Sequence, residues 1–268
     1  MAVRLRDLLL GLRSLELDET PVVVHASLSA FGEVEGGAKT VVSALESVFE
    51  AVLVPAFTYK TMVTPLVGPE GNGLKYGSGT DLNRMAEFFT PEMPADPLMG
   101  VIPETVRRHP HASRSGHPIL SFAGFNAADF LAAQTIANPF GPLGALEKAN
   151  GWVILIGVGH TVNTSIHYAE KMTGRRTFTR WALTPDGIVE CPNFPGCSAG
   201  FEALAPTLEQ FTRKAQVGEA QVQAVPLAML FKAVFTSIKR NRQALLCSQT
   251  DCERCGEIRN RPKRGESP

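Results

Sequence analysis

Residues 151–170 read GWVILIGVGHTVNTSIHYAE, and this stretch decides the fold because an apolar strand leads directly into a pair of polar side chains. Residues 153–158 are a hydrophobic run rich in Val and Ile, which predicts a strand buried on both faces. Gly157 and Gly159 then allow a sharp turn of the backbone. In open α/β sheets, ligands bind beyond the carboxyl ends of the strands, so we expect a site directly after this strand.

His167 and Glu170 follow the strand at that position. If Thr164 or Ser165 caps a helix, the two side chains lie three residues apart on one helical face. The carboxylate could then orient the imidazole and make it a better proton acceptor, as a general base requires. A surface hydrogen bond between the two side chains is the alternative interpretation, because this spacing is common on helices. Gly174 predicts that the helix ends soon afterwards.

Strands and helices alternate before this stretch. Residues 21–25 (PVVVH) and 51–59 (AVLVPAFTY) predict two strands, and apolar residues at helical spacing predict a helix over 40–49 between them. Such a βαβ unit implies parallel pairing, which places the HASLS loop and the PAFTY segment at the same edge of a sheet.

The remaining elements are less regular. The segment 61–99 predicts a long irregular excursion with a short helix at 82–88, and loops of this length usually line a binding cleft. A helix beginning near Pro103 leads into a polar loop. Further elements are expected as a strand at 119–123, a helix at 127–136, a turn at 185–187 and a final amphipathic helix at 226–242.

The composition excludes several classes of protein. The chain has 268 residues, 44% of them hydrophobic, and its 26 basic and 26 acidic side chains balance, so it lacks the positive charge of a general nucleic-acid binder. No apolar run approaches the roughly 20 residues that span a bilayer. The leucine-rich start predicts an amphipathic helix and no signal peptide, so we expect a cytoplasmic protein without membrane contact. Residues 1–255 are predicted to form one domain and residues 256–268 a charged, disordered tail.

The five cysteines permit two interpretations. An odd number without a signal peptide argues against a disulfide framework. Cys252 and Cys255 have the spacing of half a zinc site, which Cys247 and either Cys191 or Cys197 could complete if the C-terminal part folds back. A structural zinc ion held by Cys247, Cys252 and Cys255 is therefore one interpretation. Ordinary reduced cysteines in two loops are the other, because a second closely spaced pair is missing.

Four longer segments stand out by their length and order: HASLSAFGEVEGGAKTVVSAL (25–45), MGVIPETVRRHPHASRSGHPILSFAGFNA (99–127), NPFGPLGALEKANGWVILIGVG (138–159) and NTSIHYAE (163–170). In this order they resemble the aminoglycoside 3-N-acetyltransferase family of acetyl-CoA-dependent enzymes, a match far more specific than one short pattern. The resemblance implies a single α/β domain with a mixed central sheet flanked by helices. It also implies acetyl transfer from acetyl-CoA, the cosubstrate, to a primary amine. The acceptor would be the 3-amino group of an aminoglycoside. A homodimer is one assembly that we consider.

The resemblance also implies roles for individual residues. His167 would accept or relay the proton of the attacking amine while Glu170 holds the imidazole ring, and Thr164 would donate a hydroxyl to the tetrahedral intermediate. The residues implied to contact CoA lie in three places, namely the HASLS loop (Ser27, Leu28, Ser29), the expected helix start (Gly36, Gly37) and the RSGHP loop (Ser115, His117).

Other functions fit the same sequence. The acceptor could be an amine that is not an aminoglycoside, because a polycationic substrate calls for an acidic cleft and the chain has no net negative charge. A hydrolase or acyl-enzyme mechanism would use Cys197 or Ser27 as the nucleophile and His167 as the base. A CoA-binding or zinc-containing interaction protein would bind CoA without transferring its acyl group.

Overall fold

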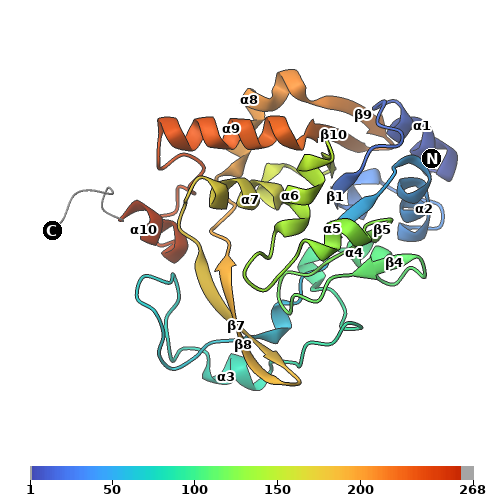
Figure 1. The fold of residues 1–268 in the computed structure, drawn as a ribbon. Helices are drawn as coiled ribbons and strands as arrows, with labels where there is room; N and C mark the ends of the chain where they lie inside the picture. Colours follow the sequence, from blue (N-terminus) through green and yellow to red (C-terminus); the bar gives the residue numbers. More distant parts are fainter. Residues whose placement is uncertain (1, 261–268) are drawn as a thin grey trace.

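The computed structural model describes residues 2–260, and a seven-stranded mixed sheet forms its centre (Figure 1). The strand order is β4-β5-β2-β1-β6-β10-β9. The strands of this sheet are β1 (Val22–Ala26), β2 (Val52–Pro55), β4 (Ala112–Arg114), β5 (Phe122–Phe125), β6 (Trp152–Ile156), β9 (Arg213–Val217) and β10 (Ala220–Pro226). The three strands β2, β1 and β6 are parallel, and an antiparallel strand joins each side of this trio. The expected parallel βαβ unit and mixed sheet are confirmed.

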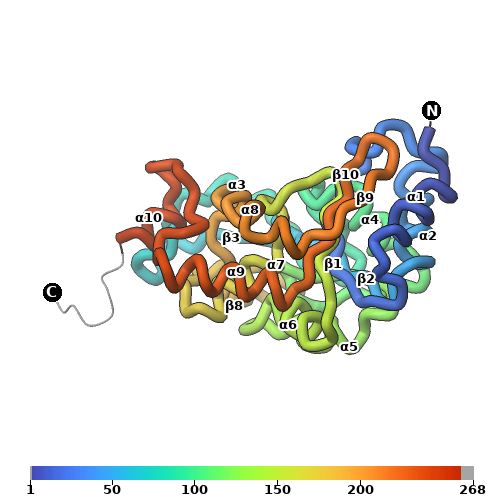
Figure 2. The backbone as a smooth tube through the Cα atoms, turned by 90° about the horizontal axis from the view of Figure 1, so that it is seen from above, coloured from blue at the N-terminus to red at the C-terminus, as the bar shows by residue number. Residues whose placement is uncertain are grey.

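Helices cover both faces of the sheet because neighbouring side chains of the central strands point to opposite sides. Ile154 and Ile156 pack with one set of helices, whereas Val153 and Leu155 pack with the other. The first set is α1 (Leu5–Arg13), α2 (Ala38–Val48) and α4 (Val101–Arg107). The second set is α5 (Ala128–Ala132), α6 (Gly141–Lys148), α7 (Ser165–Met172) and α9 (Leu227–Arg240), and Figure 2 shows α9 on the side opposite α1 and α2.

A smaller three-stranded sheet extends away from the main sheet (Figure 1). It consists of β3 (Met62–Val63), β7 (Phe178–Thr184) and β8 (Gly187–Phe194), and the predicted turn at 185–187 joins its two longer strands. The short helix α3 (Thr80–Arg84) lies in the expected irregular excursion. Short helical turns complete the fold: η1 (Leu28–Phe31), η2 (Tyr59–Thr61), η3 (Pro97–Met99), η4 (His160–Val162), η5 (Phe201–Leu204), α8 (Ala205–Leu208) and η6 (Glu209–Phe211).

The structure differs from the sequence prediction at several elements. In the predicted segment 51–59, strand β2 ends at Pro55, α3 spans Thr80–Arg84 and not 82–88, and α5 ends at Ala132 and not near residue 136. The strand expected at 119–123 begins at Phe122, because Ile119 and Leu120 donate their N–H groups to the ring of His117 within a turn. Strand β4 is not predicted by the sequence, since three residues carry no periodic pattern. A further helix, α10 (Glu253–Arg259), follows α9, so α9 is not the last helix.

Helix α10 also corrects the predicted tail. Residues 256–259 are helical and Ile258 packs against the larger core, so the predicted disorder is wrong for them. Residues 261–268 lie outside the described residues. Among the helices of residues 2–260, none combines the length and the apolar composition that crossing a membrane requires.

Candidate active site

A cavity of about 960 Å³ opens at the carboxyl ends of the parallel strands. Its walls come from the segments that follow β1, β2 and β6, from the start of α4 and from the loop after β8. This is the edge at which the sequence predicts a site. The lining includes His25, Ser27, Tyr59, Thr164 and His167.

His167 lies in the first turn of α7, with its ring held between two aromatic side chains. Phe140 stacks on it at 6.1 Å between ring centroids and an interplanar angle of 21°, and Phe201 meets it edge-on at 4.7 Å. Only 11% of the His167 side chain is exposed. The ring therefore has little freedom to turn and little contact with water.

Glu170 holds the same ring through one of its two oxygens. His167 Nδ1 lies 3.1 Å from Glu170 Oε2, and Arg175 Nη1 donates to Glu170 Oε1 at 2.5 Å. A carboxylate paired with a guanidinium accepts hydrogen bonds and cannot donate them, so Nδ1 carries a proton, and in the neutral imidazole the lone pair is then on Nε2. Nε2 has no partner within residues 2–260 and is the ring nitrogen left for a molecule in the cavity. The predicted pair of His167 and Glu170 is present in the structure.

Arg175 completes this arrangement. Its side chain is only 3% exposed, and its Nη2 donates to the carbonyl oxygens of Arg242 and Ala244 at 2.9 and 2.8 Å. The guanidinium thus links Glu170 to the segment after α9. The sequence suggests only a basic helix end for Arg175, because the carbonyls that fix it lie some 70 residues away and no local pattern indicates them.

Thr164 lines the cavity but does not cap α7 with its side chain. The capping bond comes from Asn163, whose Oδ1 accepts from the N–H of Ser165 at 3.1 Å. Thr164 is the N-cap residue of α7, which is one of the two alternatives that the sequence offers, but the side-chain bond at this end of the helix comes from its neighbour Asn163. The Thr164 hydroxyl is left for the cavity.

His25 is a cavity residue that the sequence analysis does not single out. It is the last residue but one of β1 and lies on the same face as Val23, and its Nε2 accepts the N–H of Thr164 at 3.4 Å. Burial lowers the pKa of His25 to about 3, so the ring is neutral at physiological pH. In the sequence, the position of His25 inside the HASLS motif is the feature that could have pointed to its place in the cavity.

Four of the residues expected to contact CoA line the cavity, namely Ser27, Leu28, Ser29 and Gly37. The Ser27 and Ser29 hydroxyls are 3.0 Å apart, and Gly37 directly precedes the first turn of α2. Gly36 adjoins the cavity and takes a left-handed conformation, with φ of 77°. The free peptide N–H groups at the start of α2 suit an anionic group.

Ser115 and His117 do not join this set. Ser115 Oγ accepts the N–H of Phe122 at 2.8 Å, and His117 Nδ1 accepts two N–H groups of its own loop. Both side chains are buried and serve to hold the turn before β5. Neither residue lines the cavity, so their expected contact with CoA stays a prediction without support from their position.

The alternative nucleophiles are not placed for attack. Cys197 does not line the cavity, since its sulfur belongs to a cluster with Cys247, Cys252 and Cys255. Ser27 does line it, but its hydroxyl partner is Ser29 and no bond to His167 is formed. Cys191 is buried within β8, apart from the cluster.

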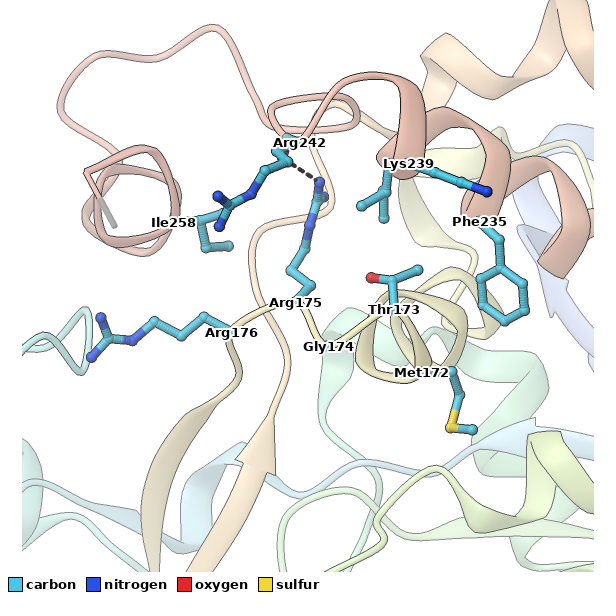
Figure 3. Close-up of a pocket in the computed structure, with 10 residues that line it drawn as sticks. Met172, Thr173, Gly174, Arg175, Arg176, Phe235, Lys239, Arg242 and Ile258 are labelled. Carbon is cyan, nitrogen blue, oxygen red and sulfur yellow. Dashed lines mark hydrogen bonds between the residues drawn. The ribbon is translucent and has the colours of Figure 1, made fainter. Parts of the chain in front are cut away.

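A second hollow of about 530 Å³ lies between the ends of α7 and α9 (Figure 3). Its polar lining is basic, with Arg175, Arg176, Lys239 and Arg242, and Figure 3 shows Arg175 directed at the backbone of Arg242. Basic side chains are common at helix C-termini, where they offset the helix dipole. Because His167 lines the larger cavity and not this hollow, the larger cavity is the candidate active site.

Comparisons with known proteins agree with this geometry. A family model described as aminoglycoside 3-N-acetyltransferase matches residues 23–239. Aminoglycoside N(3)-acetyltransferase IV from a Salmonella species is 32% identical over 170 residues, which cover 59% of this chain and 56% of that protein. The alignment thus spans little more than half of that relative.

Two solved structures share the fold over nearly the whole chain. A mutant of aminoglycoside acetyltransferase AAC(3)-IVa in complex with a gentamicin has a TM-score of 0.77 at 22% identity, covering 97% of each chain. AAC-IIIb in a binary complex with CoASH has a TM-score of 0.72 at 22% identity, covering 93% of this chain and 100% of that one. At such identities the likeness establishes the fold.

Proposed function

Because the chain belongs to the aminoglycoside 3-N-acetyltransferase family, we propose that it transfers an acetyl group from acetyl-CoA to the 3-amino group of an aminoglycoside. The observation that carries the proposal is the imidazole of His167, held by Glu170 and facing the cavity with a free Nε2. Related structures that bind CoASH or a gentamicin support the two substrates.

The proposed reaction needs no nucleophile from the protein. The neutral amine attacks the thioester carbonyl, His167 Nε2 takes the proton that the amine loses, and the C–N bond forms. The C–S bond then breaks, and the CoA sulfur receives the proton from the imidazolium. While His167 is protonated, the carboxylate of Glu170 stabilises it through Nδ1, and Phe140 and Phe201 limit access of water.

The proposed CoA site lies along the loop after β1. Ser27, Leu28 and Ser29 would contact the pantetheine arm, and the turn formed by Gly36 and Gly37 would present the start of α2 to the pyrophosphate. Thr164 would donate its hydroxyl to the oxyanion. Each of these roles follows from position in or beside the cavity.

A second candidate acceptor is an amine with little charge. Within residues 2–260, no Asp, Glu, Lys or Arg side chain lines the cavity. A polycation such as an aminoglycoside gains most from carboxylates at close range, and this wall offers hydroxyl, amide and aromatic groups instead. A primary amine on an apolar body would suit the same wall.

The test is CoA release with a panel of aminoglycosides and a panel of apolar primary amines, each with acetyl-CoA. Release is followed with a thiol reagent after the protein's own thiols are subtracted. We expect His167→Ala to lower kcat/KM by roughly 100-fold or more while leaving CoA binding nearly unchanged. His111→Ala is the matched control, because that ring is 74% exposed and contacts only Glu46 among charged partners.

The outcomes separate the candidates. Release with aminoglycosides that depends on His167 supports the first, and release with apolar amines alone supports the second. Tight binding of acetyl-CoA without release on any amine would contradict acetyl transfer. Near-normal turnover in His167→Ala would remove His167 from the mechanism.

Two proposals concern the protein as a whole. A homodimer would double the mass of the 28.9 kDa chain, which light scattering during size-exclusion chromatography measures directly. A cytoplasmic location would be checked by fractionating cells that express the chain.

A further inference from the structure

Four of the five cysteines converge on one point outside the cavity. The sulfur atoms of Cys197, Cys247, Cys252 and Cys255 all lie within 4.8 Å of one another. Cys197 comes from the loop after β8, Cys247 from the segment after α9, and the last two from the start of α10. A tetrahedral site with metal–sulfur bonds of about 2.3 Å places its sulfurs roughly 3.8 Å apart, so small side-chain rotations suffice to bind one ion.

The surroundings of the cluster suit thiolates. The N–H of Ala199 points to Cys197 Sγ at 3.5 Å. Arg254 donates to the carbonyls of Pro195 and Gly196 at 3.3 and 3.0 Å, and Arg259 donates to the carbonyl of Cys247. Two guanidinium groups thus bind the backbone of the segments that carry Cys197 and Cys247, and positive charge near the site would offset the net negative charge of a divalent ion with four thiolates.

Apart from its cysteines, helix α10 is held by the partly buried Ile258 and by the hydrogen bonds of Arg254 and Arg259 to backbone carbonyls. It has seven residues, of which only Cys255 is fully buried. A helix this short does not form in isolation, and one buried side chain supplies little hydrophobic stabilisation. A metal that joins Cys252 and Cys255 to two other segments would account for the position of this helix.

Ordinary reduced thiols explain the cluster less well. Cys191, the one cysteine outside it, shows how a single buried thiol is accommodated here, in strand β8 with its side chain in the core. The other four come from three separate segments of the chain and bring their sulfur atoms to one point. Four soft sulfur ligands in tetrahedral proximity are the ligand set that Zn²⁺ prefers.

We propose that Cys197, Cys247, Cys252 and Cys255 bind one Zn²⁺ ion in a structural site. The fourth ligand is Cys197 and not Cys191, which resolves the alternative that the sequence leaves open. All four positions are filled by protein sulfur, so the ion has no open site for a substrate and does not take part in the chemistry.

The ion would hold one wall of the active-site cavity. Pro195 and Ser198, on either side of Cys197, line that cavity, and Pro195 and Gly196 also adjoin His167. On the other side, Ala244 accepts a hydrogen bond from Arg175, three residues before Cys247. The metal would therefore position the cavity wall and the partner of Glu170 at the same time, a consequence that rests on the proposed transferase function.

The metal is tested on the purified full chain, produced with zinc in the medium and never exposed to chelator. We expect about one zinc per chain by mass spectrometry of the metal, and less than roughly a tenth of that in Cys197→Ala and Cys255→Ala. Cys191→Ala is the matched control and keeps one zinc per chain. Replacement of zinc by Co²⁺ should give the intense visible absorption of a tetrahedral thiolate site.

A measurement on the unmodified chain tests the proposal even if the variants fail to fold. Stepwise titration of the thiols with a mercurial should release zinc in proportion to four of the five cysteines, detected with a metal-binding dye. Metal-free protein with five reactive thiols, a mass lower by two disulfides, or iron in place of zinc would each overturn the assignment.

The effect on the cavity has its own measurement. Removal of zinc with a strong chelator should lower the melting temperature and raise the KM for the acceptor by more than it lowers kcat. Zinc content and melting are measured without any substrate, so they stand even if acetyl transfer is not observed. Unchanged melting after complete removal of the metal would contradict a structural site.

Discussion

Arg175 influences the orientation of His167 without contacting it, through its buried ion pair with Glu170. Its guanidinium neutralises Glu170 on one side and is fixed by two backbone carbonyls on the other. Breaking a buried pair by removing one partner leaves the other charge uncompensated, which costs more than the pair contributes when intact. We therefore treat Arg175 as a positioning residue for His167.

Replacement of Arg175 by Ala should lower the free energy of unfolding by about 3–5 kcal/mol and kcat by roughly 10-fold, because Glu170 is left unpaired and the ring of His167 loses its orientation. Urea unfolding and steady-state kinetics measure the two effects. Arg176→Ala is the control, since that side chain is 29% exposed and its ion pair with Glu257 spans 3.5 Å. Recovery of kcat in Arg175→Lys would support an electrostatic role, whereas unchanged kcat in Arg175→Ala would exclude any role in positioning.

The sequence predicts the residues of the site whose partners are local. His167 and Glu170 are one helical turn apart, and Ser27 to Ser29 follow a strand that is itself predictable. Arg175, Phe140 and Phe201 gain their roles through contacts with distant parts of the chain, which periodicity does not report. Ser115 and His117, which the resemblance assigns to CoA, do not line the cavity, because polar side chains in a loop also serve to satisfy the backbone of that loop.

At the scale of elements, the turn after β6 places the start of α7 against the loop after β1. Gly157 has φ of 63°, and a Cβ added there would overlap the Cβ of Ala30 in η1. A side chain of any size is excluded by both the backbone conformation and the contact. The glycine therefore sets how closely two walls of the cavity approach.

Replacement of Gly157 by Ala should lower the free energy of unfolding by about 1–3 kcal/mol, because η1 has to move and the backbone is strained. The same movement displaces Ser29, so the KM for acetyl-CoA should rise. Chemical denaturation and initial-rate kinetics check both effects. Gly116→Ala serves as the comparison, since nothing lies within 4 Å of a Cβ built at Gly116; equal behaviour of the two variants would refute the argument.

The elements that the sequence predicts well are long or strongly apolar. Strands β1 and β6 and helices α1, α2 and α9 bury continuous or periodic apolar residues, and the structure has each of them where the sequence predicts it, whereas β2 covers only part of the predicted segment 51–59. Strand β4 is a three-residue edge strand whose pairing with β5 is its main support. Helix α10 is polar in sequence, so its order depends on tertiary contacts of Arg254, Arg259 and the cysteines.

At the scale of the whole molecule, buried histidines make stability depend on pH. Burial lowers the pKa of His25 to about 3 and that of His117 to about 4, and it also lowers the pKa of His160. In the unfolded chain these rings protonate near pH 6.5. The unfolded state therefore binds more protons below that pH, and stability falls as the pH falls from about 6.5 towards the folded pKa values.

For His25 alone, the loss between pH 7.5 and pH 5 should be roughly 2 kcal/mol. In His25→Asn the difference in unfolding free energy between these two pH values should shrink by about that amount, whatever the stability of the variant at pH 7.5. Urea unfolding at both pH values measures it. His111→Ala, which removes an exposed ring, should keep the full difference. An identical pH dependence in His25→Asn and the unaltered chain would mean that His25 is not held neutral.

The strand order has a consequence for how the chain acquires its structure during synthesis. Val22 at the start of β1 pairs with Trp152 at the start of β6, and β6 pairs on its other side with β10. A ribosome has to add more than half of the residues before β1 meets this neighbour. Until then one edge of β1 has open N–H and C=O groups, which other unfinished chains can pair with. The centre of the sheet, where His25 and the strand before His167 lie side by side, is thus completed late by a growing chain.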